Sequence, residues 1–177
     1  MIGKHEEKKT WLIIVLLVIG IVICAGVTIW ALFFRQNSDT LIPDYAPRKT
    51  EQNAYPITGD DETKLNAPEG GGAISIEYES RVTIDLSDGM AYLNYANPGK
   101  STQDIVLRIE IKDTVVAQSG TILPGHQVSE LELLEDSAKK LREGVYDAKF
   151  RILSYDPKTG EKAMVDTLAE ITVTVQP

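Results

Sequence analysis

The strongest constraint on this chain is a run of 24 residues, 11–34, that contains no charged side chain. As a helix rising about 1.5 Å per residue it would be roughly 36 Å long, enough to cross a hydrocarbon core about 30 Å thick. Trp11, Trp30 and Phe34 lie at or near its two ends, where aromatic side chains favour the membrane interface. The sequence therefore predicts a single transmembrane helix over 11–34. A buried core helix is the alternative, but no other segment could surround a helix that is apolar on all sides.

The length and the flanks of this run predict whether it is cleaved and in which orientation it crosses the membrane. The run is longer than the apolar core of about 7–15 residues in a signal peptide, so we expect an uncleaved signal anchor. Residues 1–10 contain three Lys, whereas Arg35 is the only base in the ten residues after the run. The positive-inside rule then places 1–10 in the cytoplasm as a tail, and the C-terminal part outside the cell membrane.

Gly20, Cys24 and Thr28 are four residues apart, so they share one face of the predicted helix. Small residues at this spacing let two helices approach closely. One interpretation is weak self-association through this face; the other is that small residues are simply common in spans. In either case the predicted partner of 11–34 is membrane lipid.

The charge of the chain is unevenly distributed. The formal net charge is −8, and residues 35–177 carry 15 basic and 24 acidic side chains, a net of −9. An acidic body argues against nucleic-acid binding, which needs clustered Lys and Arg. A single Cys excludes a disulfide framework and a cysteine zinc site.

Residues 35–72 have the composition of a disordered, Pro-rich acidic linker. They show no apolar period and end in three glycines, 70–72. The acidic triplet 60–62 is interpreted as a solvated charge run rather than a cation site. The prolines of this segment are Pro43, Pro47, Pro56 and Pro68.

From Ala73 to Pro177 apolar and polar residues alternate, which is the pattern of strands with one buried face. Asp88-Gly89 predicts a hairpin turn, and Pro124-Gly125 a second turn. Seven or eight short strands in about 105 residues predict two packed antiparallel sheets. The expected fold class is therefore mainly β: a transmembrane helix followed by a β-sandwich over 73–177.

Leu141, Gly144 and Tyr146 stand directly before a predicted strand. This pattern resembles the corner of immunoglobulin-like domains at which a Tyr hydroxyl bonds to the upstream backbone. Ala148 occupies the position of the family's cysteine, and both Trp residues lie in the apolar run. The resemblance therefore implies an Ig-like antiparallel sandwich of the wide class, not an antibody domain.

The order of parts also resembles that of uncharacterised surface proteins of Gram-positive bacteria that are anchored at their N-terminus. These have a short basic tail, a span, a Pro-rich acidic tether and a β domain. The resemblance implies a place on the cell surface.

Catalytic motifs are missing from the sequence. His126 follows a turn, with Ser129 and Glu130 nearby, but neighbours along a strand do not assemble a triad. We therefore expect no enzyme activity, no cofactor and no metal.

Two hypotheses for function follow. The first is a non-enzymatic binding or scaffolding module outside the cytoplasm, with a protein or cell-wall partner held by loops or a free sheet edge. The second is an accessory subunit of a membrane transport or secretion assembly. Residues near turns that could contact a partner, or instead pack at the sandwich ends, are Tyr92, Tyr95, Asn97 and Tyr155.

Overall fold

The computed structural model describes residues 11, 14–15, 17–21, 23, 42–69 and 71–177. The chain divides into two units, 1–41 and 42–177. In the first unit the described residues, 11, 14–15, 17–21 and 23, are helical. No helix within the described residues is long and apolar enough to cross a membrane. The expected transmembrane helix is therefore a wrong prediction, because a span needs about 20 consecutive helical residues.

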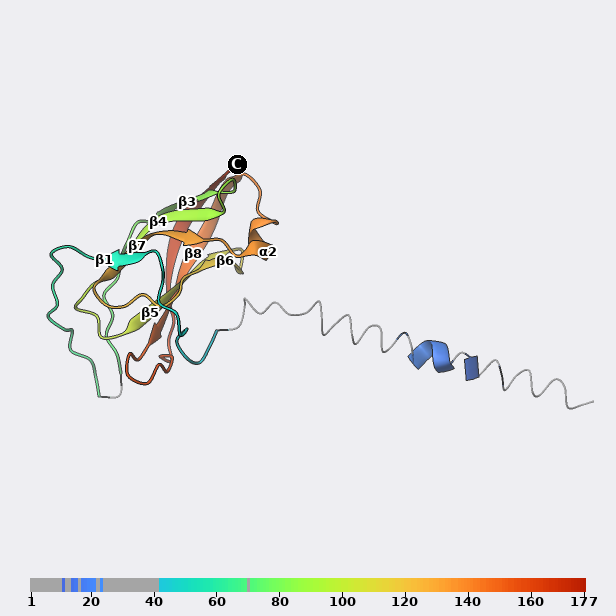
Figure 1. Cartoon of the computed structure of the whole chain (residues 1–177), viewed down its shortest axis with the longest axis horizontal. Helices are drawn as coiled ribbons and strands as arrows, with labels where there is room; N and C mark the ends of the chain where they lie inside the picture. The colour runs from blue at the N-terminus through green and yellow to red at the C-terminus, as the bar shows by residue number, and fades with distance from the viewer. Residues whose placement is uncertain (1–10, 12–13, 16, 22, 24–41, 70) are drawn as a thin grey trace, which may run out of the picture. The chain divides into compact units, whose positions relative to one another are not determined.

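The second unit is mainly β, as expected (Figure 1). Its nine strands form one sheet, however, instead of the two packed sheets with seven or eight strands in total. The strand order is β1-β7-β4-β3-β9-β8-β5-β6, with β2 paired to β4. The strands are β1 Ala54–Pro56, β2 Glu77–Tyr78, β3 Arg81–Asp85, β4 Met90–Asn97, β5 Asp104–Ile111, β6 Thr114–Gln118, β7 His126–Glu132, β8 Gly144–Tyr155 and β9 Thr167–Gln176; the one-turn helix α2 is Glu135–Ala138. The two-sheet sandwich is corrected accordingly.

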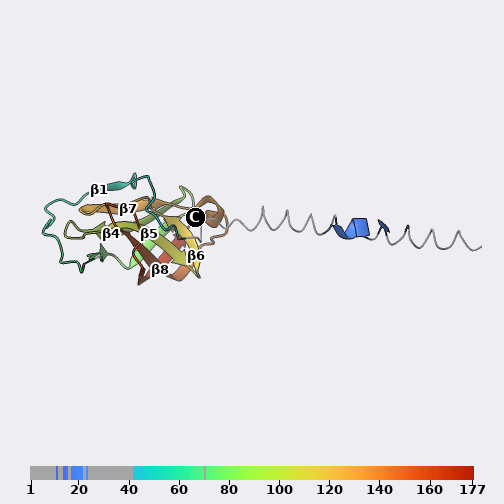
Figure 2. The same cartoon turned by 90° about the horizontal axis from the view of Figure 1, so that it is seen from below.

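The sheet curls, so that its two ends approach each other. β7 lies beside β1 near one end of the strand order, as Figures 1 and 2 both show. An isolated bridge joins Ala117 of β6 to Leu133, the residue after β7. The Leu134 amide donates to the Val116 carbonyl at 2.9 Å. This closure explains why a single sheet can bury its inner face without a second one.

Alternation along the strands places the core on the inner face. In β9, Ala169, Ile171, Val173 and Val175 are buried, while the residues between them are exposed. Phe150 of β8 lies at the centre, fully buried, with its ring 6.0 Å from that of Tyr95 and 5.8 Å from that of Tyr78. Curling therefore brings side chains of distant strands into edge-to-face contact.

The β3–β4 hairpin forms where the Asp-Gly pair predicts it. Gly89 has φ 75°, a conformation that costs glycine little, and Asp85 pairs with Met90 across the turn. By contrast, β3 pairs with β9 in parallel, with Val82 opposite Val173. This long-range pairing lies at the middle of the strand order and joins the β1-β7-β4-β3 half of the sheet to the β9-β8-β5-β6 half.

The described residues of the segment predicted as a linker, 42–69 and 71–72, belong to the second unit. We name residues 42–51 the strap. Ile42 and Ala46 pack against a small apolar cluster on the outer face of the sheet, formed by Val106, Leu153 and Tyr155. Further along, β1 pairs with β7. The folded unit therefore begins about 30 residues before the first predicted strand.

Backbone hydrogen bonds hold the strap at two places on the sheet. The Ala46 amide donates to the Gly160 carbonyl at 2.8 Å. At the other end, the Thr121 amide donates to the Lys49 carbonyl, and the Glu51 amide to the Thr121 carbonyl. Such bonds need no apolar periodicity, which is why the composition of 35–72 did not reveal them.

Candidate functional site

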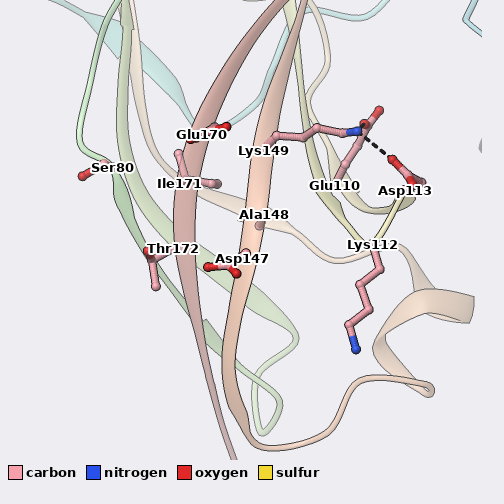
Figure 3. Close-up of a pocket in the computed structure, with 10 residues that line it drawn as sticks. All are labelled: Ser80, Glu110, Lys112, Asp113, Asp147, Ala148, Lys149, Glu170, Ile171 and Thr172. Carbon is pink, nitrogen blue, oxygen red and sulfur yellow. Dashed lines mark hydrogen bonds and ion pairs between the residues drawn. The ribbon is translucent and has the colours of Figure 1, made fainter.

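An open groove of about 600 Å³ lies on the outer face of the sheet, across β5, β8 and β9 (Figure 3). Alternation turns every second side chain of these strands outward, so polar residues line it. The lining residues are Ser80, Glu110, Lys112, Asp113, Asp147, Ala148, Lys149, Glu170, Ile171 and Thr172. The groove is thus a charged surface built from three neighbouring strands and a hairpin.

Strand register arranges the charges of the groove in rows. Lys149 of β8 stands between Glu110 of β5 and Glu170 of β9, directly opposite both. In the next row, Asp147 of β8 is opposite Thr172 of β9. Side chains directly opposite on one face lie close enough to interact. The rows therefore alternate acids, bases and hydroxyls over a short distance.

The ammonium group of Lys149 is already paired on one side. Its Nζ lies 2.7 Å from Asp113 Oδ1 and 3.6 Å from Glu110 Oε2. The hydrogen bond from Lys149 lowers the pKa of Asp113 below its ordinary value. The same bond raises the pKa of Lys149. These groups are therefore neutralised among themselves.

Two carboxylates of the groove differ from this pattern. Asp147 and Glu170 have neither a hydrogen bond nor an ion pair from their side chains within the described part of the chain. Lys112 contacts the ring of Tyr146, with Nζ 5.7 Å from its centroid. The groove consequently offers two unpaired acids and one base.

The hairpin between β5 and β6 is strained where it borders the groove. Lys112 has φ 49° and Asp113 has φ 63°, both in the left-handed region that favours glycine. A two-residue turn of this type prefers Asn-Gly. Strain of this kind is typical of functional sites, because folding alone would select against it.

Replacing Lys112 by Asn and Asp113 by Gly should raise the free energy of unfolding by about 1 kcal/mol, since both turn positions lose left-handed strain. The ion pair that disappears involves an Asp113 side chain that is 88% exposed, so it adds little stability. Urea denaturation measures the change. Asp113→Ala keeps the Cβ and loses the carboxylate; the same gain in this control would contradict the strain argument.

A largely buried ion network shares Glu110 with the lining of the groove. Glu110, whose side chain is 6% exposed, accepts hydrogen bonds from Arg151 Nε at 2.6 Å and Arg151 Nη2 at 3.2 Å. Arg108 is directly opposite Arg151 and is itself buried. Burial lowers the pKa of Arg108, whereas the bond to Glu110 raises that of Arg151. Glu110 therefore holds the guanidinium group of Arg151 in place, whereas Arg108 Nε donates to Gln118 Oε1 at 2.6 Å.

Three of the four candidate partner contacts are buried, so for them the alternative of packing within the fold applies. Tyr95 lies in the core at 1% exposure, and Tyr155 is covered by the strap and donates to the Pro43 carbonyl at 3.2 Å. Asn97 is fully buried and donates to the carbonyls of Gln103 and Ile122, both at 3.1 Å. These side chains stabilise the fold and are not available to a partner.

Tyr92 is the exposed member of that set, at 41%. It lies on the outer face of β4, and its hydroxyl donates to Asp88 Oδ2 at 2.5 Å. This hydrogen bond raises the pKa of Tyr92 to about 12, since the protonated phenol is the donor. Tyr92 is therefore accessible to a partner, but it is not one of the residues that line the groove.

The Tyr146 hydroxyl donates to the Arg142 carbonyl at 2.9 Å, the bond expected of the corner formed with Leu141 and Gly144. Gly144 has φ 150°, and Leu141 packs against the core. The corner therefore positions the start of β8, three residues before the groove residue Asp147.

Of the predicted membrane-anchor residues, Trp11 and Gly20 are helical and exposed in the first unit. The others, Cys24, Thr28, Trp30 and Phe34, lie outside the described residues. The ring of His126 is half-buried, with Nδ1 3.2 Å from the Pro124 carbonyl oxygen. Within the described ranges no three His, Cys, Asp or Glu side chains are grouped so that they could hold a metal ion.

Comparison with solved structures finds distant matches, one of which is a fimbrial subunit. AggA, the major subunit of aggregative adherence fimbriae type I from Escherichia coli, is 9% identical, with a TM-score of 0.33. The match covers 63% of this chain and 100% of that chain. No family model and no curated protein sequence matches the chain. Neither fold nor function is inferred from a likeness of this size, and the resemblance to Gram-positive surface proteins stays a prediction.

Proposed function

We propose that this protein is a non-enzymatic binding module of the bacterial cell surface, which holds a protein or cell-wall partner in the groove across β5, β8 and β9. The observation that supports this most directly is the pair of unpaired carboxylates, Asp147 and Glu170, on an open sheet face. Charged groups in such a place serve recognition better than stability, because exposed charges contribute little to the fold.

The state of the sheet edge favours the face over strand addition. At β6, the Val115 carbonyl accepts from Ser137 Oγ at 2.7 Å and the Val116 carbonyl from the Leu134 amide at 2.9 Å. A partner strand needs such carbonyls to be free. The sequence led us to expect binding by loops or by a free sheet edge. The β6 edge is partly occupied, and the groove offers a binding mode that was not expected from the sequence.

Photo-cross-linking in the native host tests the proposal with the full chain. A photo-reactive phenylalanine analogue replaces Thr172 in the groove or, as the control, exposed Glu132 at the end of β7. We expect adducts from position 172 and none from 132, and accessibility of the chain to protease added to intact cells.

Adducts from both positions, or from neither, would contradict a groove-directed partner. Protease access only after lysis would contradict the surface location. Adducts made up of transport or secretion components would favour an accessory subunit, the second hypothesis from the sequence.

A further inference from the structure

We infer that the occupant of the groove is a cationic segment of a polypeptide, with Lys or Arg side chains placed against Asp147 and Glu170. This inference rests on the proposed function and specifies the chemistry of its partner. It follows from which charges of the groove are already matched and which are not.

Matched charges leave a net negative groove. Glu110 is held by Arg151, and Asp113 by Lys149. What remains is Asp147 and Glu170 against Lys112 alone. The excess of nine acids over residues 35–177 adds a long-range field that attracts cations. Both the local and the overall charge therefore select a basic partner.

Other kinds of partner fit the groove less well. An anionic polymer would need free cations, but Lys149 is already paired with two carboxylates. An apolar partner would need exposed apolar side chains; Ile171 is only 5% exposed because its side chain belongs to the inner face. Charge and surface chemistry thus agree on a cationic polar segment.

The neighbouring hydroxyl completes a site for an ammonium or guanidinium group. Thr172 is directly opposite Asp147, and Figure 3 shows the two side chains at the same level of the groove. A cation beside Asp147 can therefore donate to a carboxylate and to a hydroxyl together. Ser80, at the border of the groove, offers a further hydroxyl.

The test uses the full chain and fluorescein-labelled hexalysine, with hexaglutamate and hexaserine as comparison peptides, measured by fluorescence anisotropy. We expect hexalysine to bind most tightly and to weaken as salt is added. Asp147→Asn with Glu170→Gln should weaken it about fivefold, the effect of two partly exposed ion pairs. Lys112→Gln should tighten it, because a repelling charge is removed.

The matched control is Glu69→Gln with Glu132→Gln, which removes the same charge from exposed positions outside the groove. It should bind hexalysine as the unaltered chain does. An equal loss in the control would overturn the inference, because net charge alone would explain binding, and so would tighter binding of hexaglutamate. Cross-linking from Thr172 without hexalysine binding would refute the cationic occupant while leaving the proposed function standing.

Discussion

A fragment that begins at residue 73, where the predicted β domain starts, should be less stable than one that begins at residue 42 by at least about 4 kcal/mol. The shorter fragment loses the strap and β1. Typical domains are stable by only about 5–15 kcal/mol, so we expect 73–177 to be largely unfolded and 42–177 to fold.

The magnitude follows from what the strap covers. Tyr155, Leu153 and Val106 are all at 0% exposure beneath Ile42 and Ala46. Re-exposing such side chains costs about 25 cal/mol per Å² of apolar surface. Several hydrogen bonds disappear as well, each with a net value of about 1 kcal/mol. Besides the backbone bonds of the strap, two hydrogen bonds with side chains are lost. The Gly120 amide donates to Glu51 Oε2 at 2.7 Å, and Thr121 Oγ1 donates to the Pro47 carbonyl at 3.0 Å.

Far-UV circular dichroism and urea denaturation of the two fragments measure the difference. Gly120→Ala tests the strap without truncation, because its Cβ would lie 2.9 Å from backbone atoms of Lys49, Thr50 and Glu51. It should destabilise 42–177 by displacing the strap. A folded 73–177 fragment, or an unaffected Gly120→Ala variant, would show that the strap is dispensable.

The strap also shows which parts of the fold were accessible from the sequence. Alternation in 73–177 predicted the strands, and Asp88-Gly89 predicted their first hairpin, because both depend on local residue types. The curl of the sheet depends on the parallel pairing of β3 with β9, between residues about 90 positions apart. Local patterns do not encode such pairing, so two sheets and one curled sheet were equally compatible with them.

The candidate site was harder to predict for the same reason. Asp147 and Glu170 look like ordinary outward residues of two strands, and only the register of β8 and β9 brings them to one groove. The available signal was the alternation of charged with other residues within 147–151, and of Glu170 and Thr172 with apolar residues in β9. Tyr95 and Asn97 were expected near a turn and therefore exposed, but the end of β4 is buried on both faces. Proximity to a turn is a poor guide to exposure where other segments cover the strand.

Glu110→Ala should lower the free energy of unfolding of the 42–177 unit by about 2–3 kcal/mol. The change removes the carboxylate that accepts two hydrogen bonds from Arg151. This guanidinium, directly opposite Arg108, then keeps only the longer contact of its Nη1 with Asp166 Oδ2 at 3.4 Å. Breaking a fully buried pair costs about 3–5 kcal/mol; the lower figure applies here because the Arg151 side chain is 23% exposed. Urea denaturation measures the loss.

Two further variants separate charge from packing. Glu110→Gln keeps the shape and one acceptor but loses the charge, so it should lie between the unaltered chain and Glu110→Ala. Glu110→Met combined with Arg151→Met removes both charges and fills the space with apolar atoms, and should regain most of the stability, because neither ion then remains unpaired in a dry place. If the double variant is as unstable as Glu110→Ala, packing around Glu110 and not the opposed guanidinium groups explains the loss. Glu110 lines the groove, but its charge is matched by Arg151. The double variant should therefore leave the affinity for hexalysine nearly unchanged. This result would separate Glu110 and Arg151, which maintain the shape of the groove, from Asp147 and Glu170, which contact the partner.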